Sequence, residues 1–404
     1  MALVYVYCAN HTSIKRRKSP IVESPAGRSG SPAPASKAWH PRPAALYTLL
    51  ALVAASVLLR LLLPLKVLES VYSRGVFLAV RAGWDATLSR LPFPLFYLFW
   101  AGVGYLLVSE IFRLRRQRRE RRTLGKRYLL SGLAYRLLTA AASLILAFLW
   151  LWGFNYGRVA VEDHMSFATY EPEVDELRQR VYGTAEELSR LRARITRDTD
   201  ALQAEHFPAD MEAAVRPLVV DALLRHDYPA PGRPRGWELL PRGVLLRLST
   251  AGVYWPWAAQ GNIDAGLHPL QKPAVMAHEL AHAYGFGDEG TCSFWAYLAA
   301  RESTDPLLTY TLELAYWRHL AGLLRYADPE EYLRWRTERL DPGIRNDLQA
   351  IYDNGELYRD IAPALRDATY TAYLKAQGIH DGLLNYGRVV QLVEGYRRSF
   401  NPEM

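Results

Sequence analysis

Cysteine is nearly absent from this chain, which contains only Cys8 and Cys292 among 404 residues. The predicted membrane segments described below place these two thiols on opposite sides of a bilayer, so we expect no disulfide within the chain. This excludes the small scaffolds that depend on disulfides. The C-terminal part is long enough to be stable through its hydrophobic core alone.

Acidic residues are scarce in residues 1–153, which contain 5 Asp or Glu against 22 Lys or Arg, a net charge of +17. Residues 154–404 contain 36 acidic and 27 basic residues, a net charge of −9. The basic pI of about 9.3 therefore describes the N-terminal part only. Because the C-terminal part is mildly acidic, we expect no nucleic-acid partner.

A cleavable signal peptide pattern is also missing, because a basic cluster at 15–18 follows a first apolar stretch of only about eight residues. Residues 1–43 are rich in Ser, Pro, Ala and Arg, and this composition is typical of disordered segments. We interpret them as a disordered, basic cytoplasmic tail.

Long apolar runs are present, by contrast, and they are concentrated after this tail. They cover Ala44–Leu65, Leu91–Val108 and Leu137–Phe154. Each approaches the roughly 20 residues that a helix needs to cross a bilayer. The alternative, buried helices of a soluble protein, is less favoured because all three runs share one flank of the chain. The sequence therefore predicts a three-helix transmembrane region over residues 44–154.

Charge predicts the orientation of these spans. The segment Arg113–Arg127 contains nine Lys or Arg against Glu120 alone, and short basic loops stay on the cytoplasmic side of a membrane. The N-terminus is then inside, and residues 155–404 form an extracytoplasmic domain. A nucleic-acid patch is the other interpretation of such a basic run, but apolar spans flank it on both sides.

The domain after the spans is predicted to be mostly helical with a small β element. The expected elements are a long helix over 171–205 interrupted near Gly183, short strands at 244–248 and 252–255, a turn at 261–264, and helices beyond Thr304. Many HExxH enzymes bind extended peptide along an edge strand that precedes the active-site helix. Residues 254–263 are the candidate for this strand.

The strongest motif is the sequence His-Glu-Leu-Ala-His at residues 278–282. In a helix that starts near Pro273, His278 and His282 lie one turn apart, so both imidazoles can reach one metal ion at roughly 2.0–2.1 Å. Glu279 is rotated about 100° from the first histidine and is placed as a general base for a metal-activated water. A helix whose two histidines merely face solvent is the alternative, and a third ligand is needed to decide.

Three carboxylates are candidates for that ligand. Asp288 completes the HExxHxxGxxD spacing of metzincin-type sites, whereas Glu289 opens a second apolar helix over 290–300 after a short turn. Thermolysin-like and related gluzincin peptidases take their third ligand from such a helix, and Ser293, four residues later, can then orient a ligand imidazole. Glu302 lies near the other end of that helix. We rank Glu289 first, Asp288 second and Glu302 third.

Several short segments outside this motif resemble one family of bacterial membrane proteins. They are Tyr72-Ser73-Arg74-Gly75, Leu91-Pro92-Phe93, Asn155-Tyr156, Tyr373-Leu374-Lys375 and the segment 385–390. The family is known as domain of unknown function 3810, and its members look like zinc metallopeptidases. Many members have Glu where this chain has Thr291, which leaves Glu289 as the better ligand. The resemblance implies a multi-pass protein of the bacterial inner (cytoplasmic) membrane.

These observations predict a membrane-anchored zinc hydrolase, most simply a gluzincin-like metallopeptidase acting on peptides or proteins. Zn²⁺ is the expected cofactor, held by His278, His282 and Glu289, and the bilayer is an expected partner. Gluzincins often use a Tyr, His or Arg from their C-terminal helices as an oxyanion donor. The candidates for this role are Tyr386, His380 and Arg388.

Two other functions remain open from the sequence. The chain could be a non-catalytic envelope scaffold or receptor whose zinc site is structural or vestigial, although such a site does not need the carboxylate of Glu279. It could also be a sensor-transducer peptidase that signals across the membrane. Peptidases of that kind keep their zinc centre on the cytoplasmic side.

Overall fold

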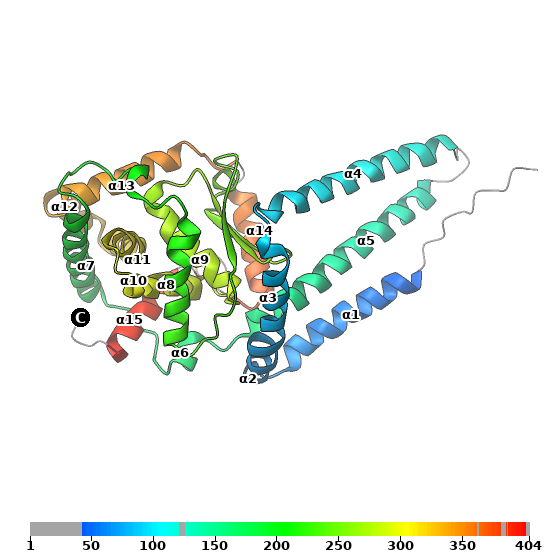
Figure 1. Cartoon of the computed structure of the whole chain (residues 1–404), viewed down its shortest axis with the longest axis horizontal. Helices are drawn as coiled ribbons and strands as arrows, with labels where there is room; N and C mark the ends of the chain where they lie inside the picture. The colour runs from blue at the N-terminus through cyan, green and yellow to red at the C-terminus, as the bar shows by residue number, and fades with distance from the viewer. Residues whose placement is uncertain (1–42, 121–125, 362, 381–384, 386, 401–404) are drawn as a thin grey trace, which may run out of the picture. The chain divides into compact units, whose positions relative to one another are not determined.

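The structure is a computed structural model. It describes residues 43–120, 126–361, 363–380, 385 and 387–400. Residues 1–42 of the predicted N-terminal tail, including Cys8, lie outside these residues, and so does Tyr386. The fold is mainly helical with a small mixed sheet, as predicted (Figure 1).

Three long apolar helices match the three predicted spans: α1 (Pro43–Leu62), α4 (Leu95–Glu120) and α5 (Lys126–Leu151). The stretches long and apolar enough to cross a membrane are Ala44–Leu62, Leu95–Gln117 and Leu130–Leu151. Many of their large apolar side chains are exposed, as expected for a lipid-facing surface. These helices indicate a multi-pass membrane protein. The basic segment Arg113–Arg127 was expected to be a loop, but its first part is helical, because α4 extends to Glu120.

The segment between the first two spans packs on the C-terminal domain, which the sequence did not predict. It consists of α2 (Leu65–Leu68), the π-helical η1 (Glu69–Val76) and α3 (Phe77–Ala86). Tyr72 and Phe77 are buried in one apolar cluster with Trp152 and Tyr254. Arg81 is also buried and donates to the carbonyl of Ala259 at 3.2 Å. The C-terminal domain is therefore packed against part of the membrane region.

The C-terminal part is built from ten helices among the described residues. They are α6 (Val161–His164), α7 (Val174–Ile195), α8 (Met211–Arg225), α9 (Lys272–Ala283), α10 (Glu289–Glu302), α11 (Pro306–Ala327), α12 (Pro329–Glu338), α13 (Pro342–Glu356), α14 (Pro363–Ala376) and α15 (Arg388–Phe400). The predicted interruption near Gly183 is wrong, because α7 runs through it without a break. The buried indoles of Trp295 and Trp317 lie in the core that α7, α8, α10 and α11 share.

Local sequence explains where several of these helices begin. Helices α11, α12 and α13 each start at an Asp-Pro pair, and the Asp side chain accepts a hydrogen bond from a backbone N–H of the first turn. The proline at the first helical position loses no hydrogen bond there, and its fixed φ already suits the helix. Helix α10 begins similarly, with Asp288 accepting from the backbone N–H of Thr291 at 2.7 Å.

The sheet has three strands, β1 (Arg235–Leu239), β2 (Gly252–Trp255) and β3 (Gln260–Asp264), in the order β1-β3-β2. β3 pairs in parallel with β1 and antiparallel with β2. Two predictions are wrong here: residues 261–264 form the central strand instead of a turn, and 244–248 contain a 3₁₀ turn at Leu246–Leu248 instead of a strand. Only the β2 end of the predicted edge segment 254–263 lies at a sheet edge.

Candidate metal centre

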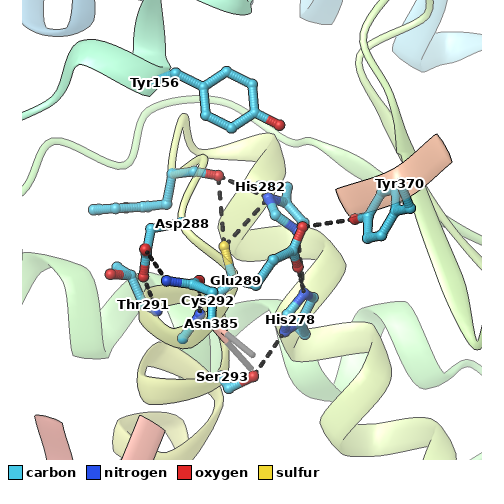
Figure 2. Close-up of polar contacts among 12 residues, drawn as sticks. Tyr156, His278, His282, Asp288, Glu289, Thr291, Cys292, Ser293, Tyr370 and Asn385 are labelled. Carbon is cyan, nitrogen blue, oxygen red and sulfur yellow. Dashed lines mark hydrogen bonds and ion pairs between the residues drawn. The ribbon is translucent and has the colours of Figure 1, made fainter. Parts of the chain in front are cut away.

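Helix α9 carries the His-Glu-Leu-Ala-His sequence and packs against the sheet and against helices α8 and α10 (Figure 1). Pro273 lies in its first turn, as predicted. The helix stops before Gly285, whose φ of +90° is readily adopted only by glycine. His278 and His282 lie on one face, and their Nε2 atoms are 3.1 Å apart (Figure 2).

Glu289, the first residue of α10, brings a carboxylate to the same point. Its Oε2 lies 3.0 Å from Nε2 of His278 and 3.4 Å from Nε2 of His282. A four-coordinate tetrahedral ion with bonds of 2.0–2.1 Å holds its ligand atoms about 3.3 Å apart. The three atoms therefore form a triangle of the size that one such ion requires.

Each of these three groups is oriented by a second contact (Figure 2). Nδ1 of His278 lies 3.1 Å from Oγ of Ser293, the contact expected from the sequence. Nδ1 of His282 lies 2.7 Å from the carbonyl oxygen of Phe286, which can only accept. The neutral imidazole of His282 therefore carries its proton on Nδ1, and its Nε2 lone pair is available for a metal. The hydroxyl of Tyr370 donates to Oε1 of Glu289 at 2.8 Å.

Cys292 is a fourth potential ligand that the sequence did not indicate. His278, His282 and Cys292 form a group that could hold a metal ion, with ligand atoms within 4.8 Å of one another. The thiol, however, lies 3.3 Å from Nδ1 of His282, on the side of the ring away from the triangle. In the metal-free chain, burial raises the pKa of Cys292 to about 12, so this thiol is protonated there.

Glu279 is buried beside this group, at 5% exposure. Within the described residues, its Oε2 has no hydrogen-bond partner. Two strand glycines make room for the side chain: a Cβ at Gly252 would lie 2.5 Å from Oε1, and one at Gly261 would lie 2.9 Å from the Glu279 Cβ. Burial raises the pKa of Glu279 to about 8. A buried carboxyl group without a partner is costly to the fold, so it points to a functional role.

The structure places Asp288 away from the triangle. One carboxylate oxygen caps α10 and accepts from Nη1 of Arg388 at 2.7 Å. The other accepts from Nδ2 of Asn385 at 2.9 Å. Glu302 lies at the far end of α10 and forms an ion pair with Arg225 at 2.5 Å.

Two of the three oxyanion donors expected from the sequence, Arg388 and His380, belong to the described residues, and both line the cavity that contains the histidines. The guanidinium of Arg388 is held by Asp288 and Glu162. His380 is exposed after α14, although it lines the same large cavity as the histidines. For Tyr386 the structure gives no position.

Three tyrosines lie at the site that no sequence argument selected. Tyr370 contacts Glu289, and the hydroxyls of Tyr156 and Tyr373 lie 3.0 Å apart, all beside the cavity that contains the histidines. Tyr370 and Tyr373 are three residues apart on α14 and so share a face. The spacing of Tyr370 and Tyr373, together with the family motifs that contain Tyr156 and Tyr373, was the sequence feature from which these tyrosines could have been predicted.

Comparison with models of known protein families gives a match over most of the chain. A family model described as "Protein of unknown function (DUF3810)" matches residues 72–393. Neither the curated proteins nor the solved structures give a match.

Proposed function

We propose that this chain, which belongs to the family described as protein of unknown function (DUF3810), is a membrane-anchored zinc hydrolase and, more specifically, a gluzincin-like metallopeptidase. One observation carries the proposal: three potential ligand atoms, 3.0–3.4 Å apart, lie beside a buried carboxylate that has no hydrogen-bond partner among the described residues. A structural site would need the ligands but not that carboxylate.

In this proposal His278, His282 and Glu289 hold the metal. Two imidazoles and one carboxylate are the donor set of many catalytic zinc sites with one open position. A zinc ion held there supplies a Lewis acid and lowers the pKa of a water molecule towards neutrality. The contacts from Ser293 and Phe286 keep both imidazoles turned towards the ion, and the hydroxyl of Tyr370 orients the carboxylate.

Glu279 acts as the general base and then as the general acid. Its carboxylate accepts a proton from water and passes it to the leaving amine of the peptide. Burial raises the pKa of this carboxyl group in the metal-free chain, and this favours the protonated form that donates to the leaving amine. Its lack of a competing hydrogen-bond partner leaves Oε2 available for the water.

Strand β2 is the element best placed to bind the peptide. It is an edge strand, because β3 pairs with it on one side only in the order β1-β3-β2. Residues 249–257, which include β2, line the cavity that contains the two histidines. An extended peptide can therefore add to this edge through backbone hydrogen bonds and pass the metal centre.

The full chain in detergent tests this function, since the segment between the first two spans packs on the C-terminal domain. We expect about one zinc ion per chain and hydrolysis of casein. A chelator should remove the activity and added zinc should restore it. Zinc without hydrolysis would favour the non-catalytic scaffold, and a chain purified under metal-replete conditions without any metal would contradict the proposed centre.

We also propose that the metal centre lies on the extracytoplasmic side of the bacterial inner membrane and that the N-terminus lies in the cytoplasm. The basic run at the end of α4 supports this orientation. In a Cys8→Ser background, Tyr326→Cys on the domain should react with a membrane-impermeant maleimide in intact spheroplasts. Arg119→Cys, near the end of α4, should react only after lysis; both native side chains are exposed. The reverse pattern would place the site in the cytoplasm, as in sensor-transducer peptidases.

A further inference from the structure

The cavity at the metal centre continues along the candidate membrane spans. Its volume is about 2660 Å³, several times the roughly 300–1,000 Å³ of common small-molecule pockets. His278, Glu279, His282 and Glu289 line one part of it. Apolar side chains of α1 and α5 line another part, among them Val57, Leu61, Ala141, Leu144, Ile145 and Phe148.

This apolar part reaches a depth that lipid tails occupy. Ala141 lies ten residues before Leu151, the end of the α5 span, which corresponds to about 15 Å along the helix. That is about half of the roughly 30 Å hydrocarbon thickness of a bilayer. The metal centre is close to the same helix end, since Nε1 of Trp152 donates to the carbonyl of His282 at 2.8 Å.

The lining also includes side chains typical of a membrane surface. Trp257 stacks on Phe99 of α4 with ring centroids 5.4 Å apart, and its Nε1 lies 3.4 Å from the carbonyl of Leu144. Arg60, near the end of the α1 span, donates to both the side chain and the backbone carbonyl of Gln377, at 2.6 and 2.7 Å. Tryptophan and arginine concentrate at the interface between lipid and water. A molecule that fills the whole cavity must therefore be polar at one end and apolar at the other.

We propose that the substrate is a peptide with a covalently attached apolar anchor that stays in the bilayer during cleavage. The anchor, an acyl chain or a membrane-spanning segment, lies along the α5 face formed by Ala141, Leu144 and Ile145. The adjoining backbone lies along β2 and reaches the metal centre. This inference rests on the proposed hydrolase function and adds the substrate class.

Paired probes test the anchor separately from the catalytic function. N-acetyl-Ala-Leu-Gly hydroxamate binds through its metal-chelating group alone, whereas its N-palmitoyl counterpart adds an acyl anchor. Both are titrated into the zinc-loaded full chain in lipid nanodiscs. Ala141→Trp should weaken binding of the palmitoyl probe at least tenfold and leave the acetyl probe unchanged, because the indole fills the apolar part only.

Ala140→Trp is the matched control. Ala140 is also exposed on α5 but lies outside the cavity lining, and the same substitution there changes the span and its lipid contacts without filling the cavity. We expect no change for either probe. Ile145→Trp, at a second exposed lining position, should repeat the effect of Ala141→Trp and guards against a folding defect in one variant. Zinc content and binding of the acetyl probe report whether each variant is folded.

A third probe, the hydroxamate fused to a membrane-spanning leucine-rich segment, distinguishes the two kinds of anchor. Selective weakening of the palmitoyl probe assigns an acyl chain, and selective weakening of the fused probe assigns a membrane-spanning segment. If neither anchored probe is weakened by Ala141→Trp and Ile145→Trp, the inference is wrong and the hydrolase proposal stands. If the zinc-loaded wild type binds none of the three hydroxamates, the hydrolase proposal itself fails.

Discussion

Glu279→Gln is expected to abolish peptide hydrolysis while the bound zinc stays at the wild-type level. The glutamate shuttles the proton in the proposed mechanism, and general acid-base catalysis contributes about 10²- to 10⁴-fold to a rate. Zinc content should not change, because the Glu279 carboxyl is not one of the three atoms of the triangle. Parallel measurement of casein hydrolysis and zinc content checks both statements.

For the same variant we expect a second effect, on how the stability of the metal-free protein depends on pH. Burial raises the pKa of Glu279 from 4.5 to about 8, so the folded chain holds this proton more tightly than the unfolded chain. The resulting stabilisation is complete below about pH 4.5 and is lost as the pH rises through about 8. Gln cannot lose a proton. Metal-free Glu279→Gln should therefore melt above the wild type at pH 9, and this difference should shrink as the pH falls to 5.

Glu302→Gln is a suitable control for both measurements. It removes a carboxylate from the far end of α10, where its partner is Arg225 on the surface. Hydrolysis and zinc content should match the wild type. Glu279→Gln with wild-type hydrolysis would show that the general base is another residue. Loss of zinc in Glu279→Gln would show that this carboxylate belongs to the coordination sphere.

The parts of the site that the sequence predicted are those fixed by local geometry. His278 and His282 share a face because a helix repeats every 3.6 residues, and a short turn returns the chain at Glu289. Ser293 then follows Glu289 by about one helical turn, on the same face, which places its hydroxyl at His278. Each step depends on residues no more than 15 positions apart, and the choice of Glu289 over Asp288 and Glu302 also depended on the resemblance to gluzincin peptidases.

Longer-range features escaped prediction for three physical reasons. Tyr370 reaches Glu289 across 81 residues, and no periodicity connects α14 with α10. Gly261 in strand β3 suggested a turn. In the structure its missing side chain lets helix α9 approach the strand, since a Cβ at this position would lie only 2.9 Å from the Cβ of Glu279. The packing of residues 65–86 on the C-terminal domain was also missed, because such short helices carry too little pattern to predict.

Glu289→Ala is expected to remove zinc from the purified chain, with an affinity loss of more than about 100-fold. Even residues that only orient a metal ligand typically contribute 10- to 100-fold, so loss of a ligand should cost more. Bound zinc stabilises a folded protein by about 2.7 kcal/mol when its concentration is 100 times its Kd. Added zinc should therefore raise the melting temperature of the wild type and leave that of Glu289→Ala unchanged.

Zinc content of Cys292→Ser and Asp288→Asn tests whether the third ligand is Cys292 or Asp288 instead of Glu289. The thiol of Cys292 faces Nδ1 of His282, whose hydrogen bond to Phe286 commits that nitrogen as a donor, so Cys292→Ser should keep its zinc. Asp288→Asn can still accept the hydrogen bond that caps α10 and loses the ion pair with Arg388 and the hydrogen bond from Asn385, neither of which touches the triangle, so it too should keep zinc. Zinc loss in Cys292→Ser with retention in Glu289→Ala would instead assign the metal to the two histidines and the thiol. A ring flip of His282 would then be required, since its Nε2 now lies 3.1 Å from Nε2 of His278.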